Sequence, residues 1–265
     1  MRDCLAIILG CEDRNIYLTL VKKIDIYHLK NENQMKKVTF IGIFALAFTI
    51  VSCKKNNTTG GIQPYMTITP QSTWQYETRD SIANTSSTYT LTSTLRDTTV
   101  TSAGASRTYH VFTNSSNNSS EYYAIQGSDY FNYREMTLAG TSGGTKLELP
   151  YLRDNANVND TWGLDFSVTA LGIPVPLRIN YRLAEKGITR VVNGITYNNV
   201  IKVTSTITSS STLIPSGGLQ SDIQNYYAPG VGSIESISKI NINIPLASIV
   251  QNISTRSFLK SSDIK

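Results

Sequence analysis

Cysteine is scarce in this sequence of 265 residues. The three cysteines are Cys4, Cys11 and Cys53, and none follows Cys53. A disulfide within the long remainder of the chain, or a zinc site built on cysteines there, is therefore excluded. That part of the chain must be stabilised by packing and by backbone hydrogen bonds.

Histidine is scarcer still: the sequence has two, and only His110 follows Cys53. A catalytic triad of serine, histidine and aspartate would have to use it, and a histidine zinc site would lack a second ligand. His110 stands between Tyr109 and Val111 in an alternating segment, which favours a hydrogen-bonded strand residue. Residues 143–146 lack the spacing of a phosphate-binding loop. We therefore predict that the protein is not an enzyme and has no cofactor other than a covalent lipid.

Acidic residues leave one route to catalysis open. Asp154, Asp160 and Asp165 flank Trp162, and a glycoside hydrolase needs two carboxyl groups about 5–10 Å apart beside its sugar. The run from 154 to 160 is rich in Asp and Asn, however, as solvated turns are. Its spacing also lacks the EF-hand pattern, so we predict no metal site.

Charge of one sign does not predominate. From Cys53 onward the sequence has 17 Lys and Arg against 14 Asp and Glu, a net charge of +3. No basic cluster follows the cysteine, and phosphate neutralisation needs a concentrated basic face. The sequence therefore predicts no nucleic-acid partner.

Long hydrophobic runs are absent apart from one. Residues 38–52 are uncharged and mostly apolar, and Lys36 and Lys37 precede them. Because a membrane-spanning helix needs roughly 20 apolar residues, this run suits the core of an export signal better. It ends in Ile50-Val51-Ser52-Cys53, which resembles the bacterial lipobox. A short membrane anchor flanked by Lys54 and Lys55 is the alternative.

The lipobox resemblance implies an address and an anchor. It makes residues 35–52 a lipoprotein signal peptide and Cys53 the site of a diacylglyceryl group and an acyl chain such as palmitate. Residues 53–64 are polar and contain two glycines, as a flexible tether does. We expect anchorage to the outer membrane. Lys54 and Lys55 stand where some surface lipoproteins have acidic residues, so the periplasmic and the surface face both stay open.

Residues 1–34 are a poor start for an export signal. They include Asp3, Glu12 and Asp25, and their apolar stretch from Leu5 to Leu9 is short. We therefore predict that translation begins at Met35 and that residues 1–34 are an upstream extension outside the translated protein.

The chain from Tyr65 onward has the composition of β-strands. Thr, Ser, Tyr, Val and Ile are abundant, and alternation places Tyr89, Leu91 and Leu95 on one face of a strand. Asn193-Gly194 between apolar segments is a strong hairpin signal. The only helix candidate is the weak one at 246–253. We therefore predict an all-β, antiparallel domain over residues 65–265.

Two halves of this domain resemble each other. Thr-Trp at 73–74 and at 161–162 is followed 35 residues after each Trp by a strand Tyr, at 109 and 197. Tyr-Tyr-Ala then occurs at 122–124 and at 226–228. We predict two repeats, about 65–145 and 146–265, that form a β-sandwich or an open flattened barrel, because a one-sided apolar sheet needs a second one to cover it. Trp74 and Trp162 would be equivalent core residues.

The segment Tyr226–Ile234 carries a second resemblance. Its letters YYAPGVGSI follow the strand segment VNGITY at 192–197, as in a group of uncharacterised Bacteroidota lipoproteins with a Tyr-Tyr-Ala-Pro-Gly-Val-Gly signature. The resemblance covers residues 146–240. It implies an outer-membrane lipoprotein with a β domain, and it brings no catalytic residues. Pro229, Gly230 and Gly232 would end one strand and bend the chain before the next.

Three functions are compatible with these features. The first is a non-enzymatic envelope scaffold or binding module. The second is a glycan- or lipid-binding accessory protein of an uptake system, and the third is an envelope glycoside hydrolase or esterase. Aromatic residues could stack on a sugar or line a cavity for a hydrophobic ligand, although cross-strand packing is their commoner use. The candidate binding residues are Tyr122, Tyr123, Tyr226, Tyr227 and Trp162.

Overall fold

The structure is a computed structural model that describes residues 63–265 except 103–104, 137–143, 171 and 246–248. The upstream extension, the signal peptide and Cys53 lie outside the described residues, so the predictions about them stay predictions. All described elements belong to one compact unit, Gly60–Lys265.

The described residues form twelve β-strands. The first six are β1 (Thr73–Asp80), β2 (Thr85–Ser102), β3 (Ala105–Asn114), β4 (Ser119–Gln126), β5 (Asp129–Met136) and β6 (Thr145–Arg153). The second six are β7 (Thr161–Ala170), β8 (Ile173–Val192), β9 (Ile195–Ser209), β10 (Leu219–Ala228), β11 (Gly232–Ile244) and β12 (Ile249–Asp263). No helix among the described residues is long and apolar enough to cross a membrane.

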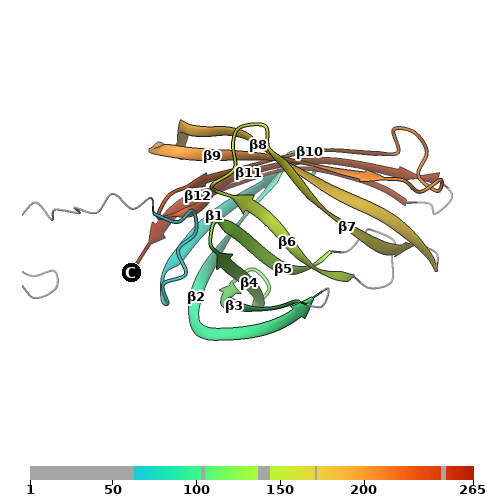
Figure 1. Ribbon diagram of the computed structural model, residues 1–265. Helices are drawn as coiled ribbons and strands as arrows, with labels where there is room; N and C mark the ends of the chain where they lie inside the picture. The colour runs from blue at the N-terminus through green and yellow to red at the C-terminus, as the bar shows by residue number, and fades with distance from the viewer. Residues whose placement is uncertain (1–62, 103–104, 137–143, 171, 246–248) are drawn as a thin grey trace, which may run out of the picture. The chain divides into compact units, whose positions relative to one another are not determined.

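All twelve strands form one antiparallel sheet in the order β6-β5-β4-β3-β2-β1-β12-β11-β10-β9-β8-β7. Strands that follow one another in sequence pair, except β6 and β7, and β12 also pairs with β1. The sheet therefore curves round until its two edges, β6 and β7, approach each other (Figure 1). Thr145 Oγ1 donates a hydrogen bond to Ser167 O at 2.8 Å across this gap. The prediction of an all-β antiparallel fold is confirmed in its open-barrel form.

The hairpin predicted at Asn193-Gly194 is present between β8 and β9. Asn193 and Gly194 have φ values of 50° and 80° between β8 and β9, which Asn and Gly tolerate better than other residues. The weak helix candidate at 246–253 is wrong for its described part, because Ile249–Ile253 belongs to β12. Pairing of Ile249 with Ile244 and of Ile253 with Ile240 on β11 overrides the local pattern.

The matching residues of the two halves lie on strands six places apart in the chain. Trp74 is on β1 and Trp162 on β7, while Tyr-Tyr-Ala ends up on β4 and on β10. Both Trp side chains are buried in the same core cluster. These positions agree with a duplicated six-strand unit, and the exact boundary between repeats stays a prediction.

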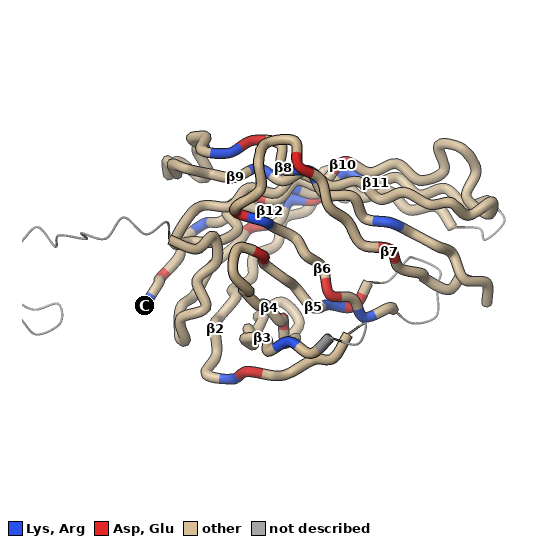
Figure 2. The backbone as a smooth tube through the Cα atoms, viewed as in Figure 1, with Lys and Arg blue, Asp and Glu red and all other residues tan. Residues whose placement is uncertain are grey.

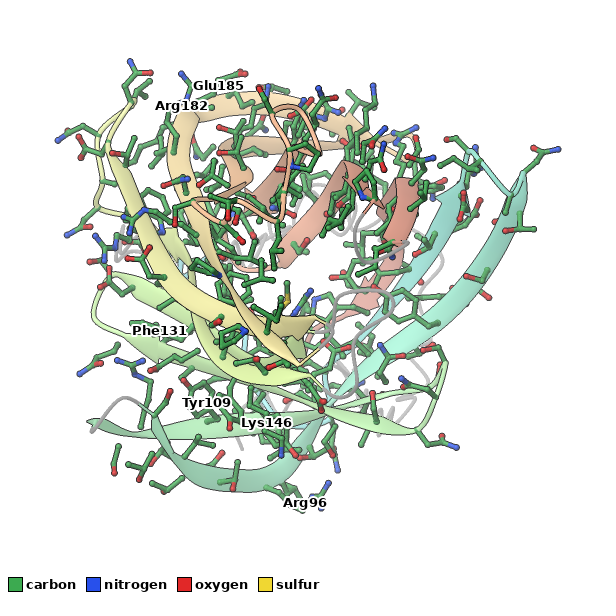
Figure 3. The ribbon with its side chains drawn as sticks, turned by 90° about the vertical axis from the view of Figure 1, so that its right-hand side faces the viewer. Arg96, Tyr109, Phe131, Lys146, Arg182 and Glu185 are labelled. Carbon is green, nitrogen blue, oxygen red and sulfur yellow. The ribbon has the colours of Figure 1, made fainter. Side chains whose placement is uncertain are left out.

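The core lies inside the barrel. Alternation along β8 buries Val175, Leu177, Ile179, Tyr181 and Leu183 and leaves the residues between them less buried. Side chains from the surrounding strands project into the interior (Figure 3). Acidic and basic positions are interspersed along the strands (Figure 2).

Candidate ligand-binding site

The first described residues close one end of the barrel. We call residues 63–72 the strap. The backbone N–H of Tyr65 donates a hydrogen bond to the hydroxyl of Tyr130 at 3.0 Å, and Gly230 N donates to Pro64 O at 2.8 Å. Tyr65 is only 5% exposed. The strap therefore packs against the start of β5 and the turn between β10 and β11.

The strap continues across the barrel to β2. The hydroxyl of Tyr151 on β6 donates to Met66 Sδ at 3.1 Å, and Gln71 N donates to Ser93 O on β2 at 2.8 Å. The strap thus joins strands from several parts of the sheet. Because the strap begins at residue 63, the part of the chain that precedes it joins the domain at this closed end.

The strap covers a cavity of about 450 Å³ inside the barrel. Met66, Trp74 and Val231 line it near the strap. Its wall carries six tyrosines: Tyr76, Tyr89, Tyr123, Tyr151, Tyr181 and Tyr227. Burial raises the pKa of Tyr181 to about 12 and raises that of Tyr76, Tyr123 and Tyr151 well above the usual value. The tyrosines are therefore neutral near pH 7 and can act as hydrogen-bond donors.

Two ionisable side chains of opposite charge line this cavity. Glu121 accepts hydrogen bonds from Tyr123 OH at 2.7 Å and from Asn114 Nδ2 at 2.6 Å. Arg134 lies on β5. Burial raises the pKa of Tyr181 and of Tyr227, and the guanidinium of Arg134 opposes the rise at both. The positive charge therefore acts inside the cavity.

A second cavity of about 230 Å³ adjoins the first. The aliphatic side chains that line it include Val168, Leu177, Ile214, Leu219, Ile242 and Ile244. Four residues line both cavities: Arg134, Met136, Ile207 and Ile240. Strands β5, β7 and β11 end beside the second cavity. The strap lies at the other end of these strands, beside the start of β5 and the turn between β10 and β11. The two cavities together therefore extend from the strap towards the opposite end of the barrel.

The predicted binding residues fall into two groups. Tyr123 and Tyr227 line the larger cavity. Tyr122 packs against Tyr133 with ring centroids 6.2 Å apart, and Tyr226 lies beneath the guanidinium of Arg190 at 4.0 Å.

Trp162 stacks on Tyr181 at 5.8 Å, and its indole N–H donates to Pro150 O at 2.6 Å. It contributes to the core beside the cavity rather than to the cavity wall itself.

His110 lies in a chain of hydrogen bonds that resembles a catalytic triad. Its Nε2 is 2.8 Å from Ser93 Oγ, and its Nδ1 is 2.8 Å from Asp97 Oδ1. Ser93 is only 1% exposed and its hydroxyl also reaches Ile68 O of the strap at 3.3 Å, so a substrate has no access to it. Asp97 is 62% exposed, unlike the buried aspartate of a triad. The chain of hydrogen bonds spans the bulge between Ser93 and Asp97 in β2 and has a structural role.

The three aspartates around Trp162 do not converge. Asp154 accepts a hydrogen bond from Tyr130 OH at 2.7 Å, Asp160 accepts one from Asn157 N at 2.8 Å, and Asp165 pairs with Arg178 at 2.5 Å. None of them lines either cavity. Within the described part of the chain, no group of three His, Cys, Asp or Glu residues could hold a metal ion.

No family model matches the sequence, and no curated protein does. Among solved structures, a candidate lipoprotein from Parabacteroides distasonis is 10% identical, with a TM-score of 0.46, and the match covers 77% of this chain and 100% of the other. A candidate exported protein with a YmcC-like fold from Bacteroides fragilis is 8% identical, with a TM-score of 0.39, and the match covers 76% of this chain and 98% of the other. The descriptions 'lipoprotein' and 'exported protein' refer to those two proteins.

Proposed function

We propose that this protein is a lipid-anchored envelope protein that holds an amphipathic, acyl-bearing ligand inside its barrel. The observation that carries the proposal is the pair of adjoining cavities, one lined by tyrosines and polar groups and the other by aliphatic side chains. Mostly apolar cavities of this size with a few directed polar groups are typical of small-molecule sites. The tyrosines face the interior of the barrel, which favours an acyl chain over a glycan stacked on an open surface.

The direction of ligand exchange follows from the strap. The strap closes the end that joins the tether, whereas the aliphatic cavity lies at the opposite end of the barrel. A ligand would therefore enter and leave at the end remote from the anchor. This arrangement suits a binding module of the uptake or assembly type, and the non-enzymatic character remains part of the proposal.

Replacing Ile207 with tryptophan should block binding, because Ile207 lines both cavities and the larger ring would fill the space between them. We expect the chain Lys54–Lys265 to bind the neutral apolar fluorophore N-phenyl-1-naphthylamine and to carry co-purified lipid in native mass spectrometry. Ile207→Trp should weaken fluorophore binding by at least about tenfold, at a cost of about 1–3 kcal/mol in stability.

Ile82→Trp is the matched control, since Ile82 is 57% exposed in the turn between β1 and β2. It should bind the fluorophore as the parent chain does. Absence of both fluorophore binding and co-purified lipid in the parent chain would rule out the proposed function.

Replacing Cys53 with serine should release the protein from the membrane, because a serine hydroxyl does not take the place of the acylated thiol. We expect full-length Cys53→Ser to incorporate no alkyne-labelled palmitate and to move into the soluble fraction. Asn56→Ser is the control and should leave labelling and membrane association unchanged. Labelled, membrane-bound Cys53→Ser protein would contradict the proposed anchor.

A further inference from the structure

We propose that Arg134 binds the anionic head group of the ligand, a carboxylate or a phosphate, while the apolar chain occupies the aliphatic cavity. This inference rests on the proposed function and names the class of ligand. The observation behind it is the place of a single cationic side chain among the residues that line both cavities.

The backbone of β5 directs Arg134 inward. Asn132, Arg134 and Met136 alternate along the strand, and all three line the larger cavity. Phe131 and Tyr133 belong to the other face of the strand, where Phe131 meets the guanidinium of Arg107 and Tyr133 packs against Tyr122. The side chain of Arg134 is exposed and also lines both cavities. Its side chain is therefore reachable from the cavities instead of being enclosed by packing.

The carboxylates nearby have other partners. Glu121, which lines the larger cavity, accepts hydrogen bonds from Tyr123 and Asn114. Glu135, which lines the second cavity, accepts one from Gly144 N at 3.0 Å. With the residues that the structure describes, Arg134 forms no ion pair. An anion from outside the protein would supply the opposite charge.

The surroundings of Arg134 strengthen such an interaction. Tyr181 and Tyr227 line the same cavity as Arg134, and burial raises the pKa of both hydroxyls, so both are protonated near pH 7. They can therefore donate hydrogen bonds to the same anion. Charge-assisted hydrogen bonds are stronger than neutral ones.

The aliphatic cavity provides the binding site for the apolar chain of the ligand. Arg134, Met136, Ile207 and Ile240 lie at the junction of the two cavities, so a ligand held at Arg134 can extend its chain along Ile242 and Ile244. A cationic amphiphile would meet a like charge at this junction, whereas a neutral alcohol would gain only the apolar contacts. The geometry thus selects an anionic amphiphile.

The test compares three ligands with one chain length, namely dodecanoate, dodecyl phosphate and dodecanol, by isothermal titration of the chain Lys54–Lys265. At least one of the two anions should bind about tenfold or more tightly than the alcohol, as expected for hydrogen bonds to a charged group. Arg134→Leu should remove that difference while dodecanol affinity stays unchanged, and Arg134→Lys should keep part of it. The stronger of the two anions identifies the head group.

Arg96→Leu is the control, because Arg96 is exposed on β2, lines neither cavity and points away from the barrel (Figure 3). It should bind all three ligands as the parent chain does. Equal affinities for anions and alcohol in the parent chain, or an Arg134→Leu variant that keeps the preference, would overturn the inference and leave the proposed function standing. Failure of every ligand, together with the neutral fluorophore, would instead overturn the proposed function.

Discussion

Replacing both Arg190 and Arg256 with methionine is expected to lower the free energy of unfolding by about 3–5 kcal/mol. Both arginines pair with Glu235, at 2.5 Å and 2.6 Å, and the side chain of Glu235 is 0% exposed. Removing the arginines would leave a buried carboxylate without a countercharge. Breaking a buried ion pair in this way is strongly destabilising, because the remaining charge is neither paired nor hydrated.

This ion cluster spans the sheet. Arg190 is on β8, Glu235 on β11 and Arg256 on β12, so Arg190 reaches Glu235 across the positions of β9 and β10 in the strand order. Its guanidinium also lies over the ring of Tyr226 at 4.0 Å. The cluster therefore holds the β8–β9 hairpin against the middle of the sheet, and its loss should weaken tertiary packing as well as charge balance.

Urea unfolding of the chain Lys54–Lys265 measures the effect. A triple variant that also changes Glu235 to methionine should recover most of the loss, because an apolar replacement of a whole buried ion cluster is often neutral or stabilising. The control pair is Arg178 and Asp165, which are 45% and 74% exposed. Its double replacement should cost less than about 1 kcal/mol. Equal losses in the two double variants would show that burial of Glu235 contributes little.

Much of the fold could be predicted because its signals are local. Alternation marks strands directly, and Asn193-Gly194 marks a hairpin because both residues adopt positive φ. The ion cluster could not be predicted in this way. Glu235 is 45 residues from Arg190 and 21 from Arg256, and nothing in the intervening sequence indicates which strands bring them together. The same holds for Ser93 and His110, whose contact depends on a bulge in β2.

The candidate site was predictable only in part. Adjacent strand residues point to opposite faces, and Tyr122 and Tyr123 could not be assigned to a face from the sequence alone. In the structure only Tyr123 of this pair lines the cavity. Arg134 was missed because a polar residue on a strand is normally read as facing solvent. Its alternation with Phe131 and Tyr133 was a usable signal, since aromatic residues on one face and polar ones on the other are compatible with a polar interior.

Removing residues 249–265 is expected to abolish cooperative folding. These residues contain β12, which lies in the middle of the sheet and pairs with both β1 and β11. Without it the two six-strand halves lose their only shared strand pairing among the described residues, and β1 and β11 become open edges.

The cost can be set against the stability of an ordinary domain. Phe258 and Leu259 on β12 are 5% and 0% exposed, and loss of a large buried side chain costs about 2–5 kcal/mol. Loss of both, together with the backbone hydrogen bonds of two ladders, approaches the roughly 5–15 kcal/mol that holds a typical domain folded. Circular dichroism during urea titration should therefore show a gradual change for the chain 54–248.

The matched control is a chain that begins at Ser72 and lacks the rest of the strap. It keeps all twelve strands and loses the burial of Tyr65 and Met66, worth about 1.5–3 kcal/mol each. This chain should unfold cooperatively at lower urea and should exchange the fluorophore faster, because the strap end of the larger cavity would be open. If the chain 54–248 also unfolded in one steep transition, β12 would be an accessory strand, and the β1–β12 pairing would not be what joins the two halves.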